Sequence, residues 1–405
     1  MVPSGWKLKT LSNITKEKVS YGIVQAGPHV SNGVPYLKSA DVGGEIDIDS
    51  LQKTAPEIHY KYRRSAVHPG DIVFSLRGNI GRMSIVPNEL IEANLTQGTA
   101  RISVDENNDS KYIYYQVAST PVLNRINALS KGSTFKEISL EELRKVKVAC
   151  APLHEQQKIA KILSTWDNAI TTTEKLIANS KQQKKALMQQ LLTGKKRLVN
   201  PETGKAFEGE WEEITLRQLG KCITGLTYSP NDVVDKGTLV LRSSNIQDGK
   251  LSFLDNVYVS SQIKEEAVSR VGDILICVRN GSRSLIGKSA YITEKAAGQT
   301  HGAFMTSFRG KNPEFVFQLF QTPMFYRQVN MNLGATINSI NTSDLHKFKF
   351  TIPKNADEIS KIAKTLATAD KEIELLEEKL AHFKQEKKAL MQQLLTGKRR
   401  VNIAA

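Results

Sequence analysis

The clearest pattern of apolar positions lies in two long segments of the chain. Between residues 359 and 394, apolar side chains recur in alternating steps of three and four, with one interruption at Lys387. This spacing places them on one side of an α-helix as a heptad seam. Residues 159–191 repeat the pattern with three polar residues in the seam. A proline precedes each segment and a Thr-Gly pair follows it, which are signals for the start and the end of a helix. We therefore expect two helices of about 40 residues, each about 60 Å long.

The long helices belong to an internal repeat. Lys184–Gly194 and Lys387–Gly397 both read KKALMQQLLTG, at an offset of 203 residues, and weaker identity extends upstream. Shorter matches link LKSADV with LRSSNI, GDIVFSLRGNIG with GDILICVRNGSRSLIG, and GSTFKEISLEELRKVKV with GATINSINTSDLHKFKF. Such self-similarity indicates that one unit has been duplicated. The helices remain nearly identical, whereas the segments before them have diverged.

The repeat divides the chain into four parts. We define module 1 as residues 1–151 and module 2 as residues 206–353, with helical segments at 152–205 and 354–405. Short runs such as DIVFSL, RISV, DILICV and FKFTI, bounded by Gly, Pro and Asn, predict strands in both modules. The fold class is therefore α+β, with two strand-rich α+β modules of about 150 residues, each large enough for its own core.

Helices are also predicted inside the modules, at residues 111–128 and near residues 313–330. A single long helix cannot bury its seam alone, so the two long helices should pack together as a coiled coil. Because the ends of a domain often lie close together, the helices should run antiparallel. This gives a pseudo-two-fold repeat with one module at each end of the helix pair.

Charge narrows the class of partner. The chain has 56 Lys and Arg against 41 Asp and Glu, for a net charge of +15 and a pI near 9.5. This balance favours a polyanion, with nucleic acid first and an anionic membrane surface second. Subtracting acidic from basic residues leaves +4 and +2 on modules 1 and 2, and +6 and +3 on the helical segments. The surplus thus favours general phosphate attraction by the helices and selective contacts by the modules.

Signals for membranes and for catalysis are weak. No run approaches 18 apolar residues and the first residues lack a signal-peptide pattern, so we expect a cytoplasmic protein. The three cysteines lie far apart and are expected to be buried thiols, and the seven histidines lack metal-ligand spacing. The segment GSRSLIGKS has five residues between its glycines, where a phosphate-binding P-loop needs four. These features disfavour an enzyme.

Polar side chains beside the glycines of the matched loops are the candidates for DNA contact, because base edges are read by such side chains on a firm frame. In module 1 they are Lys38, Ser39, Arg77, Asn79, Arg82, Ser133, Thr134 and Lys136. In module 2 they are Arg242, Ser244, Asn245, Arg279, Asn280, Arg283, Lys288, Thr336 and Asn338. The alternative is that the glycines only form turns and their polar neighbours are solvated. The recurrence of the loops with different side chains favours recognition.

Basic residues also gather toward the end of each long helix. The first group is Lys181, Lys184, Lys185, Lys195, Lys196 and Arg197, and the second is Lys384, Lys387, Lys388, Lys398, Arg399 and Arg400. Cations near a helix C-terminus are favoured by the helix dipole in any protein. In an antiparallel pair each group would also lie beside one module, where it could bind phosphates.

The repeated segments resemble a known family. APLHEQQKIAKILSTWD, both KKALMQQLLTGK runs, and the GSTFKEIS and GATINSIN segments are similar to the specificity (S) subunit of type I restriction-modification systems. The likeness spans the whole chain. The start of the second long helix departs from the pattern, with Asp357-Glu358 where Glu-Gln is usual. We interpret this as drift.

The resemblance implies a non-catalytic subunit that binds double-stranded DNA. Each module would be a target recognition domain for one half of a bipartite, asymmetric site, and the helix pair would set the half-site spacing. Two methyltransferase (M) subunits would carry S-adenosylmethionine, and up to two restriction (R) subunits would carry ATP and magnesium. This chain would itself bind no cofactor or metal and would lie in a bacterial or archaeal cytoplasm.

Two other readings remain open at this point. The first is a stand-alone DNA methyltransferase or nuclease whose active site has no recognised motif. The second is a coiled-coil interaction protein whose basic surface has no role in DNA binding. Turnover by the isolated chain would indicate the first, and a lack of sequence preference in binding would indicate the second.

Overall fold

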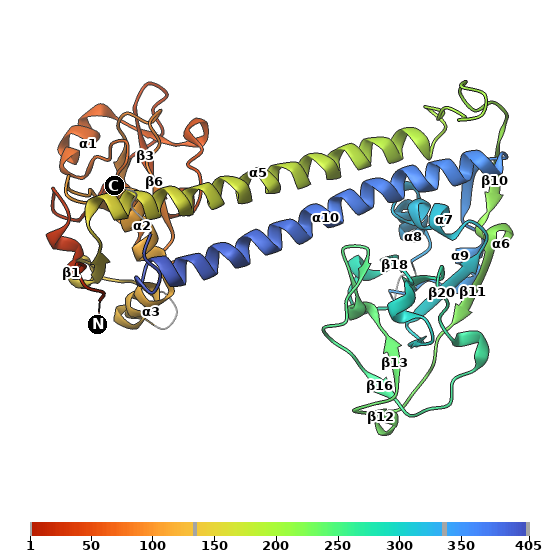
Figure 1. Ribbon diagram of the computed structural model, residues 1–405. Helices are drawn as coiled ribbons and strands as arrows, with labels where there is room; N and C mark the ends of the chain where they lie inside the picture. Colours follow the sequence, from red (N-terminus) through yellow and green to blue (C-terminus); the bar gives the residue numbers. More distant parts are fainter. Residues whose placement is uncertain (1, 133–135, 334–337, 402–405) are drawn as a thin grey trace. The chain divides into compact units, whose positions relative to one another are not determined.

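The computed structural model describes residues 2–132, 136–333 and 338–401, and its architecture is α+β (Figure 1). Two compact units make up the chain. Unit 1 contains Met1–Glu174 and Glu378–Ala405, and unit 2 contains Lys175–Glu377. Each unit therefore holds one module together with one half of each long helix. The predicted fold class, with two strand-rich modules and two long helices in contact, is confirmed.

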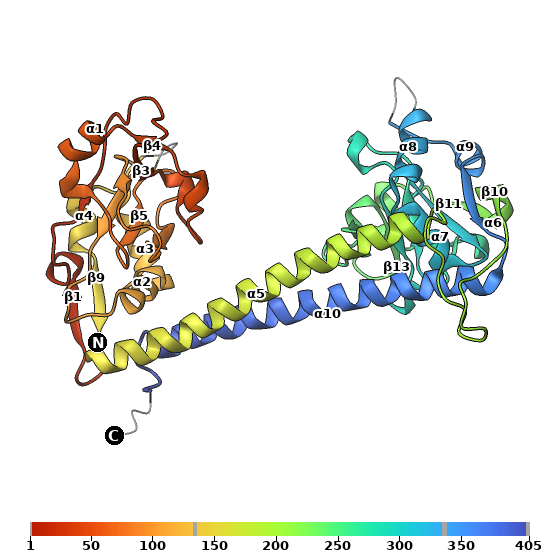
Figure 2. The ribbon, with the colours of Figure 1, turned by 90° about the horizontal axis from the view of Figure 1, so that it is seen from above.

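Module 1 is built from three small sheets. Its strands are β1 (Lys7–Thr10), β2 (Ser20–Tyr21), β3 (Val34–Leu37), β4 (Lys53–Thr54), β5 (Ile72–Ser75), β6 (Met83–Ile85), β7 (Asn94–Leu95), β8 (Thr99–Ile102) and β9 (Lys147–Cys150). The largest sheet has the order β2-β8-β5-β6, beside a β4-β3-β7 sheet. The pair β1-β9 is antiparallel and lies where the chain enters the first long helix (Figure 2). The four residues of β5 are all buried, which fits the apolar run that predicted this strand.

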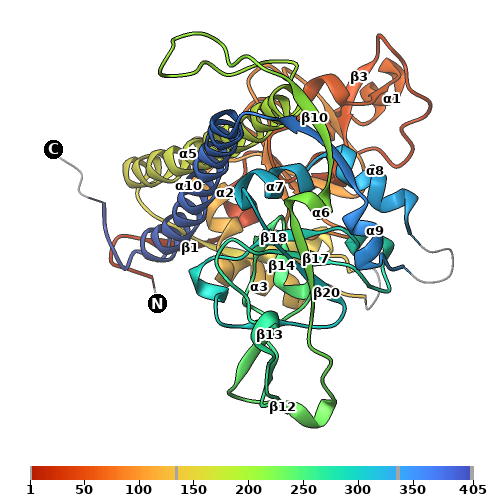
Figure 3. The ribbon, with the colours of Figure 1, turned by 90° about the vertical axis from the view of Figure 1, so that its right-hand side faces the viewer.

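Module 2 repeats this plan. Its strands are β10 (Trp211–Thr215), β11 (Gly220–Thr224), β12 (Val233–Val234), β13 (Thr238–Leu241), β14 (Ile246–Gln247), β15 (Lys250–Leu251), β16 (Tyr258–Val259), β17 (Ile274–Cys277), β18 (Ser289–Tyr291), β19 (Thr300–His301), β20 (Met305–Gly310) and β21 (Lys349–Pro353). The sheet β11-β20-β17-β18 corresponds to the largest sheet of module 1, and a second sheet has the order β12-β16-β13-β19. In Figures 1 and 3 this second sheet lies on the side of module 2 away from α10 (Ala356–Leu394).

Each module contains two short helices where the sequence predicts one. Module 1 has α1 (Pro56–Lys61), α2 (Ser110–Ala118), α3 (Thr120–Leu129) and α4 (Leu140–Lys145), and module 2 has α6 (Leu216–Leu219), α7 (Pro313–Phe320), α8 (Pro323–Met331) and α9 (Thr342–His346). Each single helix that the sequence predicts over this stretch is thus a pair of helices, α2–α3 or α7–α8. The break falls beside a Thr-Pro step in both modules, and the capping residues Ser119 and Thr322 have extended backbones. Proline has no backbone N–H, and its ring clashes with the carbonyl four residues earlier, so Pro121 and Pro323 fit the first turn of a helix but would break a continuous one.

The two long helices are α5 (Leu153–Leu191) and α10, each with 39 residues. In unit 1 the first half of α5 contacts the last half of α10, and Trp166 lies edge-on to Phe383 with ring centroids 5.6 Å apart. In unit 2 the last half of α5 contacts the first half of α10, and Lys184 Nζ lies 2.5 Å from Asp370 Oδ1. The helices therefore run antiparallel, as predicted. None of the helices within the described residues has the length and apolar character of a membrane span.

Each module packs its core onto the ends of both long helices. The core of module 1 includes Ile159 and Leu163 of α5 and Leu394 of α10. The core of module 2 includes Leu191 of α5 and Leu366 of α10. Because these contacts come from both helices, each module and its helix ends form one hydrophobic unit. The apolar spacing that the two helices share thus serves the modules as well as the helix pair.

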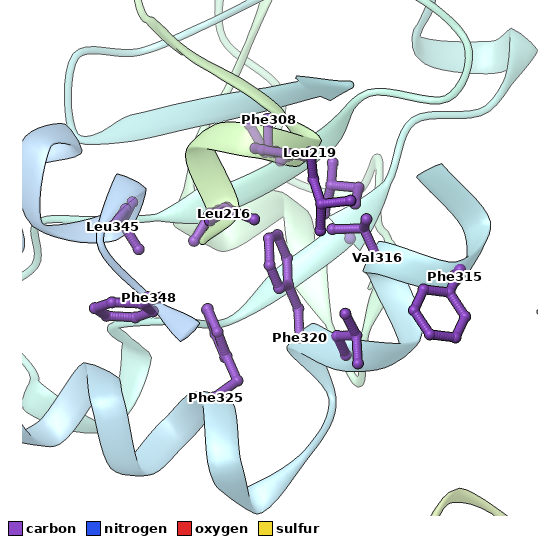
Figure 4. Close-up of a cluster of buried hydrophobic side chains, with 14 of the residues drawn as sticks. Leu216, Leu219, Phe308, Phe315, Val316, Phe320, Phe325, Leu345 and Phe348 are labelled. Carbon is purple, nitrogen blue, oxygen red and sulfur yellow. The ribbon is translucent and has the colours of Figure 1, made fainter. Parts of the chain in front are cut away.

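Aromatic rings fill the centre of module 2 (Figure 4). Phe320 of α7 stacks on Phe325 of α8 with ring centroids 4.6 Å apart. Phe308 lies 5.7 Å from Phe320, and Phe348 lies 5.9 Å from Phe325, both nearly edge-on. Edge-on and offset rings of this kind stabilise a core beyond the area that they bury. This core holds the frame on which the loops of module 2 are carried.

The cysteines are free thiols, as expected from their spacing. Cys150 and Cys277 are buried and Cys222 is half-buried. Burial raises the pKa of Cys150 and of Cys277 to about 11, and the pKa of Cys222 to about 12. A thiol with such a pKa is almost entirely protonated at neutral pH, so it is a poor nucleophile.

Candidate nucleic-acid interface

In module 1, hydrogen bonds join three of the predicted loops. The backbone N–H of Leu76, just after β5, donates to the Gly98 carbonyl at 2.9 Å. The Ser39 hydroxyl, after β3, donates to the same carbonyl at 3.0 Å. The N–H of Ile138 donates to the Leu76 carbonyl at 3.1 Å. The loops after β3 and β5 and the segment that follows residue 135 therefore meet at one place, with Gly98 at its centre.

Module 2 forms the equivalent hydrogen bonds between its loops, and we call this shared set of bonds around Leu76 and Val278 the loop frame. The N–H of Val278, just after β17, donates to the Phe304 carbonyl at 3.1 Å, and the N–H of Ile340 donates to the Val278 carbonyl at 2.9 Å. The Asn280 amide donates to the Ser243 hydroxyl at 3.0 Å, which ties the loop after β13 to the loop after β17. The sequence predicted that these loops correspond between modules, and the matching hydrogen bonds show that they do.

The basic side chains on the loop frame of module 1 differ in their contacts. Arg77 is exposed and its Nε lies 2.8 Å from Glu137 Oε1, in a pair whose two side chains are about half exposed. Arg82 is also exposed and crosses Gly43, where an added Cβ would lie 2.2 Å from Arg82 Nε. Gly43 has a φ of +117°, so this position favours glycine in any case. A glycine here leaves room for the guanidinium of Arg82 close to the backbone.

The other module 1 candidates divide by exposure. Asn79 and Lys136 are exposed, whereas Lys38 and Ser39 are half-buried. The N–H of Lys38 donates to Asp41 Oδ2 at 2.8 Å, which fixes the turn after β3. Ser133 and Thr134 lie outside the described residues.

In the loop after β13, the candidate side chains of module 2 contact their own loop or are buried in it. Asn245 is fully buried, and its amide donates to the carbonyls of Ser252 and Asp255 at 2.9 and 3.2 Å. Its side chain thus closes this loop and is not presented to solvent. Arg242 pairs with Asp255, Nη2 to Oδ2 at 2.9 Å. Ser244 has a buried hydroxyl without a hydrogen-bond partner among the described residues.

The loop after β17 presents most of the accessible candidates of module 2. Arg279 and Arg283 are exposed, and Asn280 and Lys288 are half-buried. The amide of Asn338 donates to the Gly281 carbonyl at 2.9 Å, and Thr336 lies outside the described residues. Lys288 and Arg82 correspond, because the N–H groups of Cys277 and Ser75 donate to their carbonyls at 2.9 and 2.8 Å. The two modules thus place a basic residue at the same point of the frame.

Two residues of this region were missed by sequence reasoning. Glu137 neutralises part of the Arg77 charge, and Phe304 carries a largely exposed ring at the centre of the module 2 frame. Phe304 could have been noticed as a lone aromatic residue in the glycine-containing turn THGAFM. Arg279 lies over this ring, with its Cζ 5.8 Å from the ring centroid.

The basic groups at the helix ends contribute to the scaffold. The guanidinium of Arg400 binds Glu155 with Nε and Nη2 at 2.7 and 2.8 Å, and that of Arg197 binds Glu358 at 2.5 and 2.6 Å. Both glutamates are buried, each near the start of a long helix. Lys387 pairs with Asp167 in unit 1, as Lys184 pairs with Asp370 in unit 2. These four cations therefore hold the helix pair together, while Lys185, Lys195, Lys196, Lys388, Lys398 and Arg399 are exposed.

These pairs also explain the altered start of the second long helix. Glu358 occupies the position of Glu155 at the offset of 203 residues. Each glutamate forms an ion pair with the arginine that follows the C-terminal end of the opposite long helix, Glu155 with Arg400 and Glu358 with Arg197. The next residue differs, with Gln156 in α5 and Ile359 in α10. Gln156 binds module 1 through the Asp109 N–H at 2.9 Å, whereas Ile359 packs in the core of module 2. The drift inferred from the sequence thus spares the glutamate.

No group of three or more His, Cys, Asp or Glu side chains within residues 2–132, 136–333 and 338–401 could hold a metal ion.

Comparison with known proteins identifies the family. The family described as "Type I restriction modification DNA specificity domain" matches residues 3–181 and again residues 208–385. The MjaVIII specificity subunit of Methanocaldococcus jannaschii is 25% identical, over 99% of this chain and 94% of its own length. The EcoBI specificity subunit of Escherichia coli is 29% identical, over 52% of this chain and 43% of its own length.

Solved structures agree on the fold. The S subunit of a type I restriction-modification system from M. genitalium superimposes with a TM-score of 0.65 at 15% identity, covering 100% of this chain and 97% of that one. A chain from a study of complex assembly and conformational transition of the type I system gives 0.56 at 16% identity, covering 98% and 100%. The twofold family match and the loop frame built twice lead to one conclusion: the chain belongs to the DNA specificity subunits of type I restriction-modification systems, the non-catalytic component of those enzymes.

Proposed function

We propose that module 1 and module 2, with the boundaries 1–151 and 206–353, are target recognition domains that each read one half of a bipartite, asymmetric duplex site. One observation carries the proposal. The same backbone frame occurs twice, yet it presents different side chains, such as Lys136 against Asn338 and Gly98 against Phe304. A duplicated frame with unlike polar surfaces is what two different base sequences require.

The accessible side chains on each frame are the proposed contacts. In module 1 they are Lys38, Ser39, Arg77, Asn79, Arg82 and Lys136, and in module 2 they are Arg242, Arg279, Asn280, Arg283, Lys288 and Asn338, all of them exposed or half-buried. Arginine binds the acceptor atoms of guanine, and asparagine binds adenine, with paired hydrogen bonds. Ser133, Thr134 and Thr336 remain sequence-based proposals on the same loops. The exposed cations at the helix ends would add phosphate contacts without sequence preference.

Exchange of module 2 tests the proposal. Residues 206–353 are replaced by the corresponding module of another specificity subunit, and the chain is expressed with its methyltransferase subunits. Methylated adenines are then mapped across the host genome. We expect one half-site to change and the other to stay the same. The reciprocal exchange of residues 1–151 should change only the other half-site, and a change in both halves after one exchange would refute the proposal.

We further propose that the helical segments 152–205 and 354–405 set the half-site spacing and dock two methyltransferase subunits. The support is an exposed surface that is identical at the C-terminal ends of both helices, with Lys185 and Gln189 and the following Thr193 repeated as Lys388, Gln392 and Thr396. Packing cannot explain the identity of exposed side chains, whereas binding the same partner twice can. In unit 2 this face borders a cavity of about 660 Å³ that Met188, Leu192, Pro323, Met324 and Phe350 line.

A charge on this face should reduce the number of bound methyltransferase subunits. Gln189→Arg should remove one subunit, and Gln189→Arg with Gln392→Arg should remove both, as counted by native mass spectrometry. Gln182→Arg, an exposed glutamine of α5 that does not line the cavity, is the matched control. Two bound subunits in the double variant would refute this docking face.

Cofactors in this proposal belong to the partners. S-adenosylmethionine would be bound by the methyltransferase subunits, and ATP with magnesium by restriction subunits where the host has them. The isolated chain should therefore shift a specific duplex, yet neither methylate it with S-adenosylmethionine nor cut it with magnesium. Turnover by the isolated chain would favour a stand-alone enzyme.

A further inference from the structure

Phe304 is an apolar ring held at the surface of module 2. Its side chain is 58% exposed, on the loop between β19 and β20. Its carbonyl accepts hydrogen bonds from the N–H groups of Val278 and Arg279, both at 3.1 Å, so the backbone beneath the ring is fixed. Exposing a phenyl ring to water forgoes the free energy that burial would provide. A fixed and exposed ring that lies among the proposed base-contacting side chains is therefore available to a ligand.

The loop frame does not need this ring. Gly98 stands at the equivalent point of module 1, where it accepts the Leu76 N–H in the same way. A Cβ added at Gly98 would lie 2.9 Å from the Ser39 hydroxyl oxygen, so a side chain there would require the Ser39 hydroxyl to move. Because module 1 closes the same loops with glycine, the aromatic residue of module 2 is a difference between the two recognition surfaces.

Arg279 shares the surface with the ring. Its Cζ lies 5.8 Å from the Phe304 ring centroid, within the range of a cation–π contact. The corresponding arginine of module 1, Arg77, instead pairs with Glu137. In module 2 Ser339 takes the place of Glu137, as the bridge between Arg279 and Ser339 shows. The guanidinium of Arg279 thus lies over an apolar ring and carries its full charge beside it.

The surrounding side chains favour the major groove. Arg279, Asn280 and Arg283 lie on the same loop, and such donors distinguish all four base pairs only in the major groove. The thymine methyl is the apolar group that the major groove offers, and phenyl side chains contact it. An insertion of the ring between base steps would instead need the minor groove.

We infer that Phe304 is a specificity-determining residue of module 2, which reads the C5-methyl of one thymine in the major groove beside a base that Arg279 contacts. This rests on the proposed function of module 2 as a DNA reader. The ring would be covered by the methyl group, and the guanidinium would approach the neighbouring base edge with its orientation set by the ring.

Replacement of thymine by uracil tests the inference, because uracil lacks only the methyl group and pairs identically. The probe is a duplex that carries the mapped recognition site, with each thymine of the module 2 half-site replaced in turn on either strand. Binding is measured for the chain assembled with its methyltransferase subunits. One replacement should weaken wild-type binding by roughly four-fold, the factor expected for burying one methyl group. Replacements in the module 1 half-site are the duplex control.

Variants of Phe304 complete the cycle. Phe304→Ala should weaken binding to the thymine duplex and lose all sensitivity to that one uracil replacement. Phe304→Leu, which keeps an apolar surface, should retain part of it. Leu254→Ala is the matched control, because Leu254 is 91% exposed and lies between β15 and β16, outside the loop frame. It should leave every binding curve unchanged.

The possible failures are distinct. Equal uracil sensitivity of Phe304→Ala and wild type at every position would overturn the inference, while module 2 would remain a DNA reader. Weaker binding of Phe304→Ala without any uracil-sensitive position in the wild type would point to insertion between bases and would also overturn it. A module 2 exchange that leaves both half-sites unchanged would instead refute the proposed function.

Discussion

Modules 1 and 2 share the backbone hydrogen bonds of their recognition loops but not the side chains around them. In module 1 the Leu76 N–H donates to the Gly98 carbonyl, and the Leu76 carbonyl accepts from Ile138. In module 2 the Val278 N–H donates to the Phe304 carbonyl, and the Val278 carbonyl accepts from Ile340. Around these shared bonds the side chains differ in charge and in apolar surface. In module 1 an arginine is paired with a glutamate, and in module 2 the matching arginine lies on a phenyl ring. The comparison indicates that backbone bonds carry the shape of the recognition loops, which leaves the side chains free to diverge.

A second difference lies where the modules join the helices, and it leads to the largest expected effect. Glu358 in unit 2 is fully buried against Arg197, whose side chain is 22% exposed. Removing one partner of a buried pair leaves an uncompensated charge, so Arg197→Ala should lower the free energy of unfolding of unit 2 by about 3–5 kcal/mol. Urea denaturation, monitored by hydrogen exchange of the backbone amides in unit 2, would measure this loss.

Arg400→Ala should cost unit 1 less. The carboxylate of Glu155 keeps a second donor, Trp6 Nε1 at 3.1 Å, whereas the corresponding Trp211 Nε1 has no partner within the described chain. Lys196→Ala is the control, because it removes the same charge from an exposed residue next to Arg197. An equal or larger loss for Arg400→Ala would contradict the difference between the two units.

A smaller effect is expected on DNA binding. Arg279→Ala should weaken specific binding of the assembled complex by about five- to 150-fold, because one good bidentate base contact is worth about 1–3 kcal/mol. Arg77→Ala should cost less, since Glu137 already neutralises part of its charge. Fluorescence anisotropy with duplexes altered in one half-site at a time would compare the two.

Glu137→Gln sharpens this comparison. It removes the acidic partner of Arg77 and should raise affinity a few-fold, with a gain that shrinks as salt increases. Both side chains of the pair are about half exposed, so little change in stability is expected. A loss of affinity in this variant would indicate that Glu137 itself contacts DNA or positions Arg77.

The sequence predicted the elements that rest on periodicity and repetition. The heptad seam and the two KKALMQQLLTG runs were sufficient for the antiparallel helices, and matched glycines located the corresponding loops. The sequence did not predict the orientation of single side chains. Asn245 turns inward to close its own loop, and Arg197 and Arg400 bind glutamates more than 150 residues away in sequence. Such pairings depend on which elements meet in space, and spacing along the chain does not encode them.

The smallest effect concerns acid stability, and it also separates the modules. His301 of β19 is buried, with its Nε2 3.0 Å from the Ile223 carbonyl oxygen. Leu95 takes its place in module 1, because β7 pairs with β3 as β19 pairs with β13. Burial lowers the pKa of His301 below its ordinary value of 6.5, although the hydrogen bond with the Ile223 carbonyl and the charge of Asp273 act in the opposite direction.

This direction fixes the sign of the pH dependence. Above about pH 6.5 His301 is neutral in both the folded and the unfolded chain, so it adds no slope to the stability curve. As the pH falls below that value, the unfolded chain takes up a proton that the folded module excludes, and the free energy of unfolding of module 2 decreases. His301→Leu should abolish this part of the decrease, and Ile223 would keep its hydrogen bond from the Thr306 hydroxyl. Denaturation curves at pH 5, 6, 7 and 8 would measure it, and parallel curves for the two proteins would show that the buried histidine is not the group that separates module 2 from module 1 in acid.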